Sequence, residues 1–130
     1  MSLLQRQHPI VLRNLQNISS VDRAVTVITL AEQVQGRLAT FRRARNEAES
    51  SRMLQFLLQT IEFYQTIQVL PYDDKSAVEF ERLRQLKIRI GTQDLRIAAI
   101  ALSNQATVVT RNYRDFERVP ELNITDWTVA

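Results

Sequence analysis

The chain has 130 residues, of which 45% are hydrophobic and 24% charged, a composition typical of one globular domain and not of a disordered or fibrous chain. It contains no cysteine, which excludes disulfides, thiolate nucleophiles and cysteine-ligated zinc. Its net charge of +3, with cations that are almost all arginine, permits nucleic-acid binding without requiring it. No segment near the N-terminus resembles a signal peptide or membrane span, so we expect a cytoplasmic protein.

The first half of the chain is predicted to form a strand and two helices. Residues 24–30 are a β-branched run that predicts a strand, and this run leads directly into a helix. The inner stripe of that helix consists of Leu30, Val34, Leu38 and Phe41. A second apolar stripe at helical spacing follows in residues 54–64, and we expect these two helices to pack together.

The second half alternates strands and helices. Residues 67–70 predict a short strand ended by Pro71, after which Asp73 or Asp74 can cap the next helix. We expect a further helix from Gln93 to Asn104 with Thr92 as its N-cap, and strands at residues 107–110 and 122–124. This alternation, with continuous apolar runs, favours an α/β domain whose parallel sheet is covered on both faces.

Four arginines gather in the first half of the chain, and two interpretations of them remain open. They are Arg37, Arg42, Arg43 and Arg45. The planar fork of arginine suits phosphate oxygens, so the cluster could bind nucleic acid. An ordinary solvated helix face explains it equally well.

Three carboxylates follow predicted strands, where a parallel α/β fold places its active site. Glu32 comes after the first strand, Asp94 lies in the first turn of its helix, and Asp115 follows the strand at residues 107–110 by a short loop. We expect them to converge in one acidic pocket, where oxygen ligands suit Mg²⁺ or Mn²⁺ and not zinc. The alternative is structural, with Glu32 and Asp94 as helix-start residues and Asp115 as a turn former.

The residue patterns of four segments resemble motifs of the PIN-domain family, and the resemblance is closest to the bacterial VapC-like toxins of that family. Residues 92–102 (TQDLRIAAIAL) resemble the family's D-x-x-I-A-A-x-A-L helix, and residues 107–116 (TVVTRNYRDF) resemble its T-x-x-T-x-N-x-x-D-F strand and loop. Residues 28–36 (ITLAEQVQG) resemble an S/T-x-x-E-x-x-x-G helix start, and residues 119–127 resemble the final strand. The resemblance spans essentially the whole chain.

The resemblance implies a fold and an activity. The fold is a three-layer α/β domain with a mainly parallel central sheet flanked by helices. The activity is that of a Mg²⁺- or Mn²⁺-dependent endoribonuclease, commonly the toxin of a toxin–antitoxin pair, which cleaves RNA, forms a homodimer and is inhibited by its antitoxin. Glu32, Asp94 and Asp115 match the family's acidic metal-site positions, and Thr110 and Asn112 match polar residues that line that site.

The N-terminus departs from the family pattern. PIN domains begin with a strand that ends in L-D-T-N/D-x-L, and residues 2–6 resemble what normally follows that strand. We therefore expect a single domain over residues 1–130 that is truncated at its N-terminus, lacks the central strand and the first catalytic aspartate, and has a damaged sheet or one completed by another chain. Such a chain would be a weak or inactive ribonuclease. The alternatives are a non-catalytic PIN-like module that binds an antitoxin or RNA, and a soluble domain whose motifs are structural.

Overall fold

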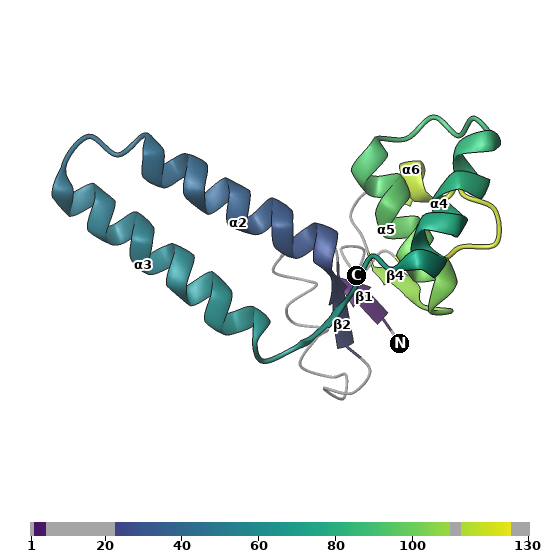
Figure 1. The fold of residues 1–130 in the computed structure, drawn as a ribbon, viewed down its shortest axis with the longest axis horizontal. Helices are drawn as coiled ribbons and strands as arrows, with labels where there is room; N and C mark the ends of the chain where they lie inside the picture. Colours follow the sequence, from purple (N-terminus) through teal and green to yellow (C-terminus); the bar gives the residue numbers. More distant parts are fainter. Residues whose placement is uncertain (1, 5–22, 110–112, 126–130) are drawn as a thin grey trace.

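The structure is a computed structural model, and it describes residues 2–4, 23–109 and 113–125. From β2 onward, one or two helices separate each strand from the next (Figure 1). The strands are β1 (Ser2–Leu4), β2 (Arg23–Thr26), β3 (Gln68–Leu70), β4 (Thr107–Val109) and β5 (Asn123–Thr125). The helices are α2 (Val27–Arg42), α3 (Glu47–Tyr64), α4 (Asp74–Gln85), α5 (Thr92–Ser103) and α6 (Tyr113–Phe116).

The five strands form one parallel sheet in the order β3-β2-β1-β4-β5. Strand β1 is the central strand of the sheet. Its residue Ser2 pairs with Arg23 of β2 on one side and with Thr107 of β4 on the other. The expectation that the central strand is absent, and that the sheet is damaged or completed by another chain, is therefore wrong. Three residues at the start of the chain complete the sheet within a single chain.

The backbone explains why so short a strand takes this place. Without β1, the facing edges of β2 and β4 would leave rows of peptide groups without partners in the middle of the fold, and unpaired buried peptide groups are costly. A three-residue strand that pairs on both sides satisfies both edges. The sequence of residues 2–4 has no periodicity that predicts this pairing, because the pairing depends on strands that lie far along the chain.

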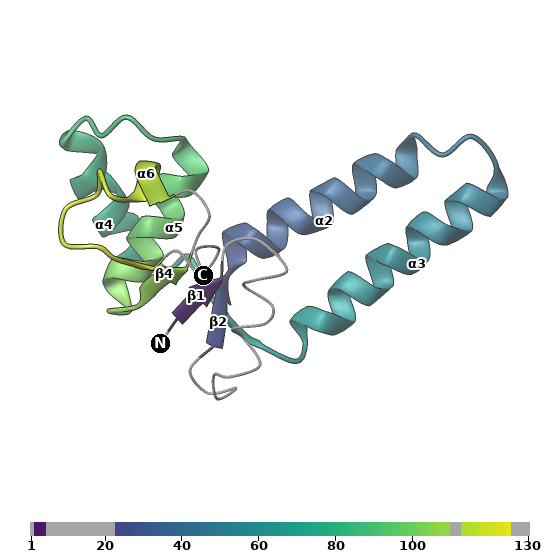
Figure 2. The same ribbon diagram turned by 180° about the vertical axis from the view of Figure 1, so that it is seen from behind.

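Helices α2 and α3 pack against each other as a long hairpin that projects from the sheet (Figures 1 and 2). We call this hairpin the arm. The predicted packing of the two helices is confirmed, but the predicted strand at residues 24–30 ends at Thr26. The buried Thr26 side chain ends it, because its Oγ1 accepts a hydrogen bond from the Thr29 backbone nitrogen (3.2 Å) and caps α2.

Helices α4, α5 and α6 lie together on the other side of the sheet (Figure 1). Asp73 caps α4 as predicted, whereas α5 has Gly91 and not Thr92 at its N-cap. The Gly91 carbonyl already accepts the first helical hydrogen bond, from the Leu95 nitrogen (2.9 Å), so Thr92 is the first residue of the helix. The predicted loop around Asp115 is also a helix, the single turn α6.

Two core clusters cover the sheet on opposite faces. Ala24 and Val108 belong to one cluster, and their neighbours Val25 and Val109 belong to the other, because successive side chains of a strand point to opposite faces. The larger cluster contains the buried residues of α5. No helix in the described part of the chain is long and apolar enough to cross a membrane.

Candidate functional site

Glu32 lies in the second turn of α2, the helix that begins directly after β2. The chain turns from strand to helix at Thr26, and the buried Thr29 lies one helical turn before Glu32. Residues three apart share a helix face, so Glu32 shares a face with Thr29. Its own side chain is exposed. The cap at Thr26 therefore fixes the start of α2, and Glu32 reaches solvent close to the end of the sheet.

Asp94 lies in the first turn of α5 and is half-buried. The N-terminus of a helix carries partial positive charge, which favours a carboxylate at this position. The helix behind Asp94 is the most deeply buried of the structure: Ala98, Ala99, Ile100 and Ala101 are fully inaccessible to solvent. Asp94 is thus attached to a rigid element of the core.

Asp115 is half-buried in α6, which lies beside α5 in both views (Figures 1 and 2). The next residue, Phe116, is fully buried in the same core cluster as Leu95, the residue after Asp94. The two carboxylates therefore each adjoin a side chain of one common cluster. This shared anchoring holds α6 against the body of the domain.

The structure brings the elements of the site together, but it shows no complete ligand set. Helix α2 contacts α5. Among the described residues, no group of three or more histidine, cysteine or acidic side chains could hold a metal ion. Thr110 and Asn112 lie outside the described residues. The first acid of the sequence is Asp22, which also lies outside them.

The donor chemistry at these positions fits a hard cation. Carboxylate oxygens are the ligands that Mg²⁺ prefers, and Mg²⁺ is often held by only one or two carboxylates while it keeps several waters and binds substrate phosphates. Asp94 and Asp115 supply two carboxylates, the kind of ligand that Mg²⁺ prefers, and Glu32 on α2 supplies a third. The chain has no cysteine and one histidine, so it offers no thiolate ligand for a softer metal.

A polar network that the sequence analysis did not identify fixes α4 against α5. The Asp73 carboxylate accepts hydrogen bonds from the backbone nitrogen and from Oγ of Ser76 (3.0 Å each), and Ser76 Oγ lies 3.3 Å from Ser103 Oγ. The hydrogen bonds from Ser76 hold the pKa of Asp73 below its usual value. Ser76 is fully buried, so its pairing with Ser103 joins the start of α4 to the end of α5. The D-x-x-S pattern of residues 73–76 is the sequence signal that indicates the contact between Asp73 and Ser76.

Comparison with known proteins identifies relatives over nearly the full length of the chain. The "tRNA(fMet)-specific endonuclease VapC" of Salmonella typhimurium is 32% identical over 127 residues, which cover 94% of this chain and 88% of the relative. "Ribonuclease VapC1" of Haemophilus influenzae strain R2866 is 29% identical over 128 residues, which cover 97% and 90%. No family profile matches the chain.

Solved structures agree in fold. FitAcB from Neisseria gonorrhoeae matches all of both chains with a TM-score of 0.78 at 21% identity. DNA-bound VapBC from Salmonella typhimurium matches 97% of both chains with a TM-score of 0.75 at 25% identity. The predicted α/β fold with parallel strands is therefore confirmed, and the chain belongs to the VapC family, the bacterial PIN-domain ribonucleases of toxin–antitoxin systems.

Proposed function

We propose that this chain is a Mg²⁺- or Mn²⁺-dependent endoribonuclease that hydrolyses phosphodiester bonds of RNA in the cytoplasm, with Glu32, Asp94 and Asp115 at its metal site. The observation that carries the proposal is the anchoring of Asp94 and Asp115. Both are half-buried, and each precedes a residue of one core cluster, Leu95 and Phe116. Rigid support of this kind is what a site needs to keep its geometry.

The side chains have separate tasks in this proposal. Asp94 and Asp115 would hold the cation, and the partial positive charge at the α5 N-terminus favours a carboxylate at the position of Asp94. Glu32, on the exposed face of α2, would orient a water or complete the ligand set. Thr110 and Asn112 would hydrogen-bond the substrate. A cation bound by such carboxylates supplies activation of water and neutralisation of the phosphate charge.

The partners that we propose are RNA, an antitoxin protein and a second copy of the chain. The similar solved structures support the antitoxin, since they include VapBC from Salmonella typhimurium and a toxin–antitoxin complex from Klebsiella pneumoniae, the latter with a TM-score of 0.72 at 17% identity. The Salmonella and Shigella relatives are named as tRNA(fMet)-specific endonucleases. That RNA is therefore the first substrate to assay.

A second candidate function is a PIN-like module that binds an antitoxin or RNA without cutting it. The observation in its favour is the acid content of the N-terminal segment: no aspartate or glutamate occurs before Asp22, although the family places an aspartate directly after its central strand. A cation that lacks one carboxylate binds more weakly, because ligand charge sets affinity at such sites. A binding module of this kind would therefore cleave RNA weakly or not at all.

Cleavage of tRNA(fMet) with and without Mn²⁺ tests both candidates. We expect slow, Mn²⁺-dependent cleavage that falls at least about tenfold in Asp94→Asn and in Asp115→Asn, while Asp74→Asn, in the first turn of α4, has no effect. Gln5→Asp, which adds a carboxylate directly after β1, should raise the rate. Cleavage that persists in Asp94→Asn would contradict the assigned site, and complete inactivity of both the native chain and Gln5→Asp would favour the binding module.

A further inference from the structure

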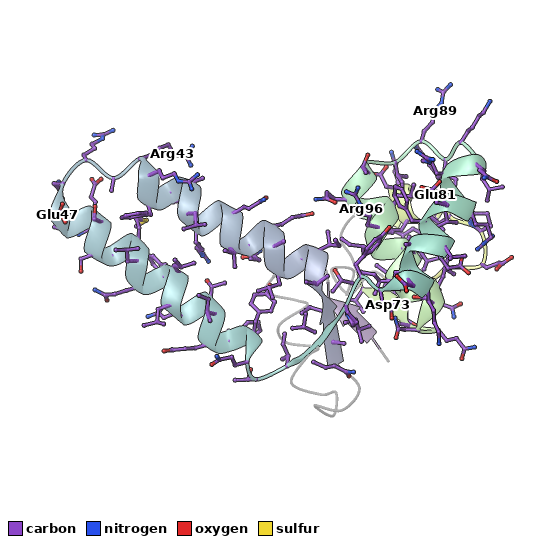
Figure 3. All side chains as sticks on the ribbon, viewed as in Figure 1. Arg43, Glu47, Asp73, Glu81, Arg89 and Arg96 are labelled. Atoms are coloured by element: carbon purple, nitrogen blue, oxygen red, sulfur yellow. The ribbon has the colours of Figure 1, made fainter. Side chains whose placement is uncertain are left out.

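Exposed arginines gather at the far end of the arm, where α2 turns into α3. We call Arg42, Arg43, Arg45 and Arg52 the tip arginines; all four are exposed. Arg43 follows the last residue of α2, and Figure 3 shows both Arg43 and Glu47 at the end of the arm that is remote from the sheet. The segment from Arg42 to Arg52 holds these four arginines against two glutamates. The end of the arm is therefore a basic surface.

The tip arginines form no ion pair within the described residues. The ion pairs of the described residues lie elsewhere and join Arg82 and Arg84, both on α4, to glutamates. Glu49, an acid at the tip, accepts a hydrogen bond from the backbone nitrogen of Arg45 (2.8 Å) and not from a guanidinium group. The guanidinium groups at the tip thus keep donors available for a ligand.

Helix stabilisation accounts for only part of this cluster. Arg42 and Arg43 lie at the C-terminus of α2, where a cation interacts favourably with the helix dipole. Arg45 and Arg52 lie just before and within the first two turns of α3, at the positive end of that helix, where a cation gains nothing from the dipole. The helix dipole therefore does not account for arginine at these two positions.

Three of the tip arginines line one hollow in the surface. The hollow has a volume of about 470 Å³ and is lined by Thr40, Arg43, Ala44, Arg45, Glu49, Arg52 and Met53. Among these residues only Ala44 and Met53 are apolar, whereas protein–protein interfaces are built around an apolar core. The exposed large apolar side chains of α3, such as Leu54 and Leu58, are not among the lining residues. The chemistry of the hollow suits a polyanion that offers charge and little apolar surface.

We infer that the tip arginines bind backbone phosphates of the RNA substrate at a distance from the carboxylates, an inference that rests on the proposed nuclease function. Arginine contacts phosphate oxygens through two parallel N–H groups, and phosphate contacts position a nucleic acid without reading its sequence. The arm thus contributes affinity and register, while the carboxylates carry the chemistry.

The helix geometry sets the length of RNA that can reach both places. Arg43, the C-cap of α2, lies eleven positions after Glu32, a distance of about 16 Å at about 1.5 Å per residue. Stacked nucleotides advance by about 3.4 Å each, so the tip contacts phosphates about five nucleotides from those near Glu32. An RNA of about 12 nucleotides is roughly twice as long as this separation, so it can reach both places.

Equilibrium binding of a fluorescein-labelled oligouridylate of about 12 nucleotides tests the inference by its salt dependence. All proteins carry Asp94→Asn, so that RNA is not cut. The double substitution R43Q/R52Q removes two tip charges, and R84Q/R89Q removes two exposed charges elsewhere. Each lost phosphate contact on a single strand lowers the slope of log K against log salt by about 0.7. We expect R43Q/R52Q to lower it by about 1.4 and to weaken binding roughly threefold to tenfold.

The outcomes separate this inference from the proposed function. Equal losses in R43Q/R52Q and R84Q/R89Q would show that only total charge matters, which would overturn the inference. An oligoglutamate peptide that binds the tip while the RNA does not would also overturn it, in favour of an acidic protein partner. A chain that never cleaves RNA, yet binds it with the predicted loss in R43Q/R52Q, would refute the nuclease proposal and retain the tip as an RNA-binding surface.

Discussion

The two sides of the sheet differ in how deeply their helices are buried. Helix α5 has 12 residues and buries six of them, including Leu95, Ile97 and Ile100. Helix α3 has 18 residues and buries only Tyr64, and α2 buries only Thr29. The helices of the arm therefore contribute little to the core and much to the surface. This difference explains why Asp94 and Asp115, which adjoin the core, are half-buried, whereas Arg42, Arg43, Arg45 and Arg52 of the arm are exposed.

The arm is held together by contacts near its surface. The Arg37 guanidinium group lies 5.5 Å from the centre of the Phe56 ring, and its Nε donates a hydrogen bond to Thr60 Oγ1 (3.2 Å). At the base of the arm, burial raises the pKa of Tyr64, and the charge of Arg37 opposes that rise. Polar and cation–π contacts thus join the two helices of the arm, in which few side chains are fully buried.

The largest effect should come from matched truncations in the two regions. Ile100→Ala removes a fully buried side chain of α5 and should lower the free energy of unfolding by about 2–5 kcal/mol, because it leaves a cavity. Leu58→Ala on α3, where the side chain is 57% exposed, should change it by no more than about 0.5 kcal/mol. Urea denaturation measures both. Similar losses in the two variants would mean that the exposed face of α3 is covered in solution.

A smaller effect is expected within the arm. Arg37→Ala and Phe56→Ala each remove one side of the cation–π contact, and a double-mutant cycle isolates their coupling. We expect a coupling energy of about 0.5–1 kcal/mol, the usual value for an exposed pair. Arg96 and Phe80, whose guanidinium and ring centre lie 5.2 Å apart, provide the matched pair on the body of the domain. A coupling near zero for Arg37 and Phe56 would show that the arm is stabilised by other contacts.

Local signals predicted the elements that local chemistry determines. Pro71 ended a strand and Asp73 capped a helix, because both effects depend on the residue itself and its immediate neighbours. Residues 27–30 were misassigned to a strand because a short β-branched run has no periodicity that separates strand from helix. In the structure, the hydrogen bond from the Thr29 nitrogen to Thr26 Oγ1 marks the start of the helix. The central position of Ser2–Leu4 depends on β2 and β4, which no local pattern reveals.

The residues of the candidate site stay a prediction. Their positions after predicted strands and their match to PIN-family motifs both indicated Glu32, Asp94 and Asp115. Glu32 is exposed, whereas the two aspartates are half-buried. This difference depends on tertiary packing, because Asp94 and Asp115 directly precede Leu95 and Phe116, which are buried in one core cluster. The motif around Asp94 is also a packing signal, because its alanines are fully buried.

In the function that we propose, half-buried carboxylates on the body of the domain hold a divalent cation. Calorimetric titration of the chain with Mn²⁺, which needs no RNA, tests it most directly. We predict one site per chain whose affinity falls at least about tenfold in Asp94→Asn and is unchanged in Asp74→Asn, although both aspartates lie in the first turn of a helix. Equal Mn²⁺ affinity in the native chain, Asp94→Asn and Asp74→Asn would contradict the claim.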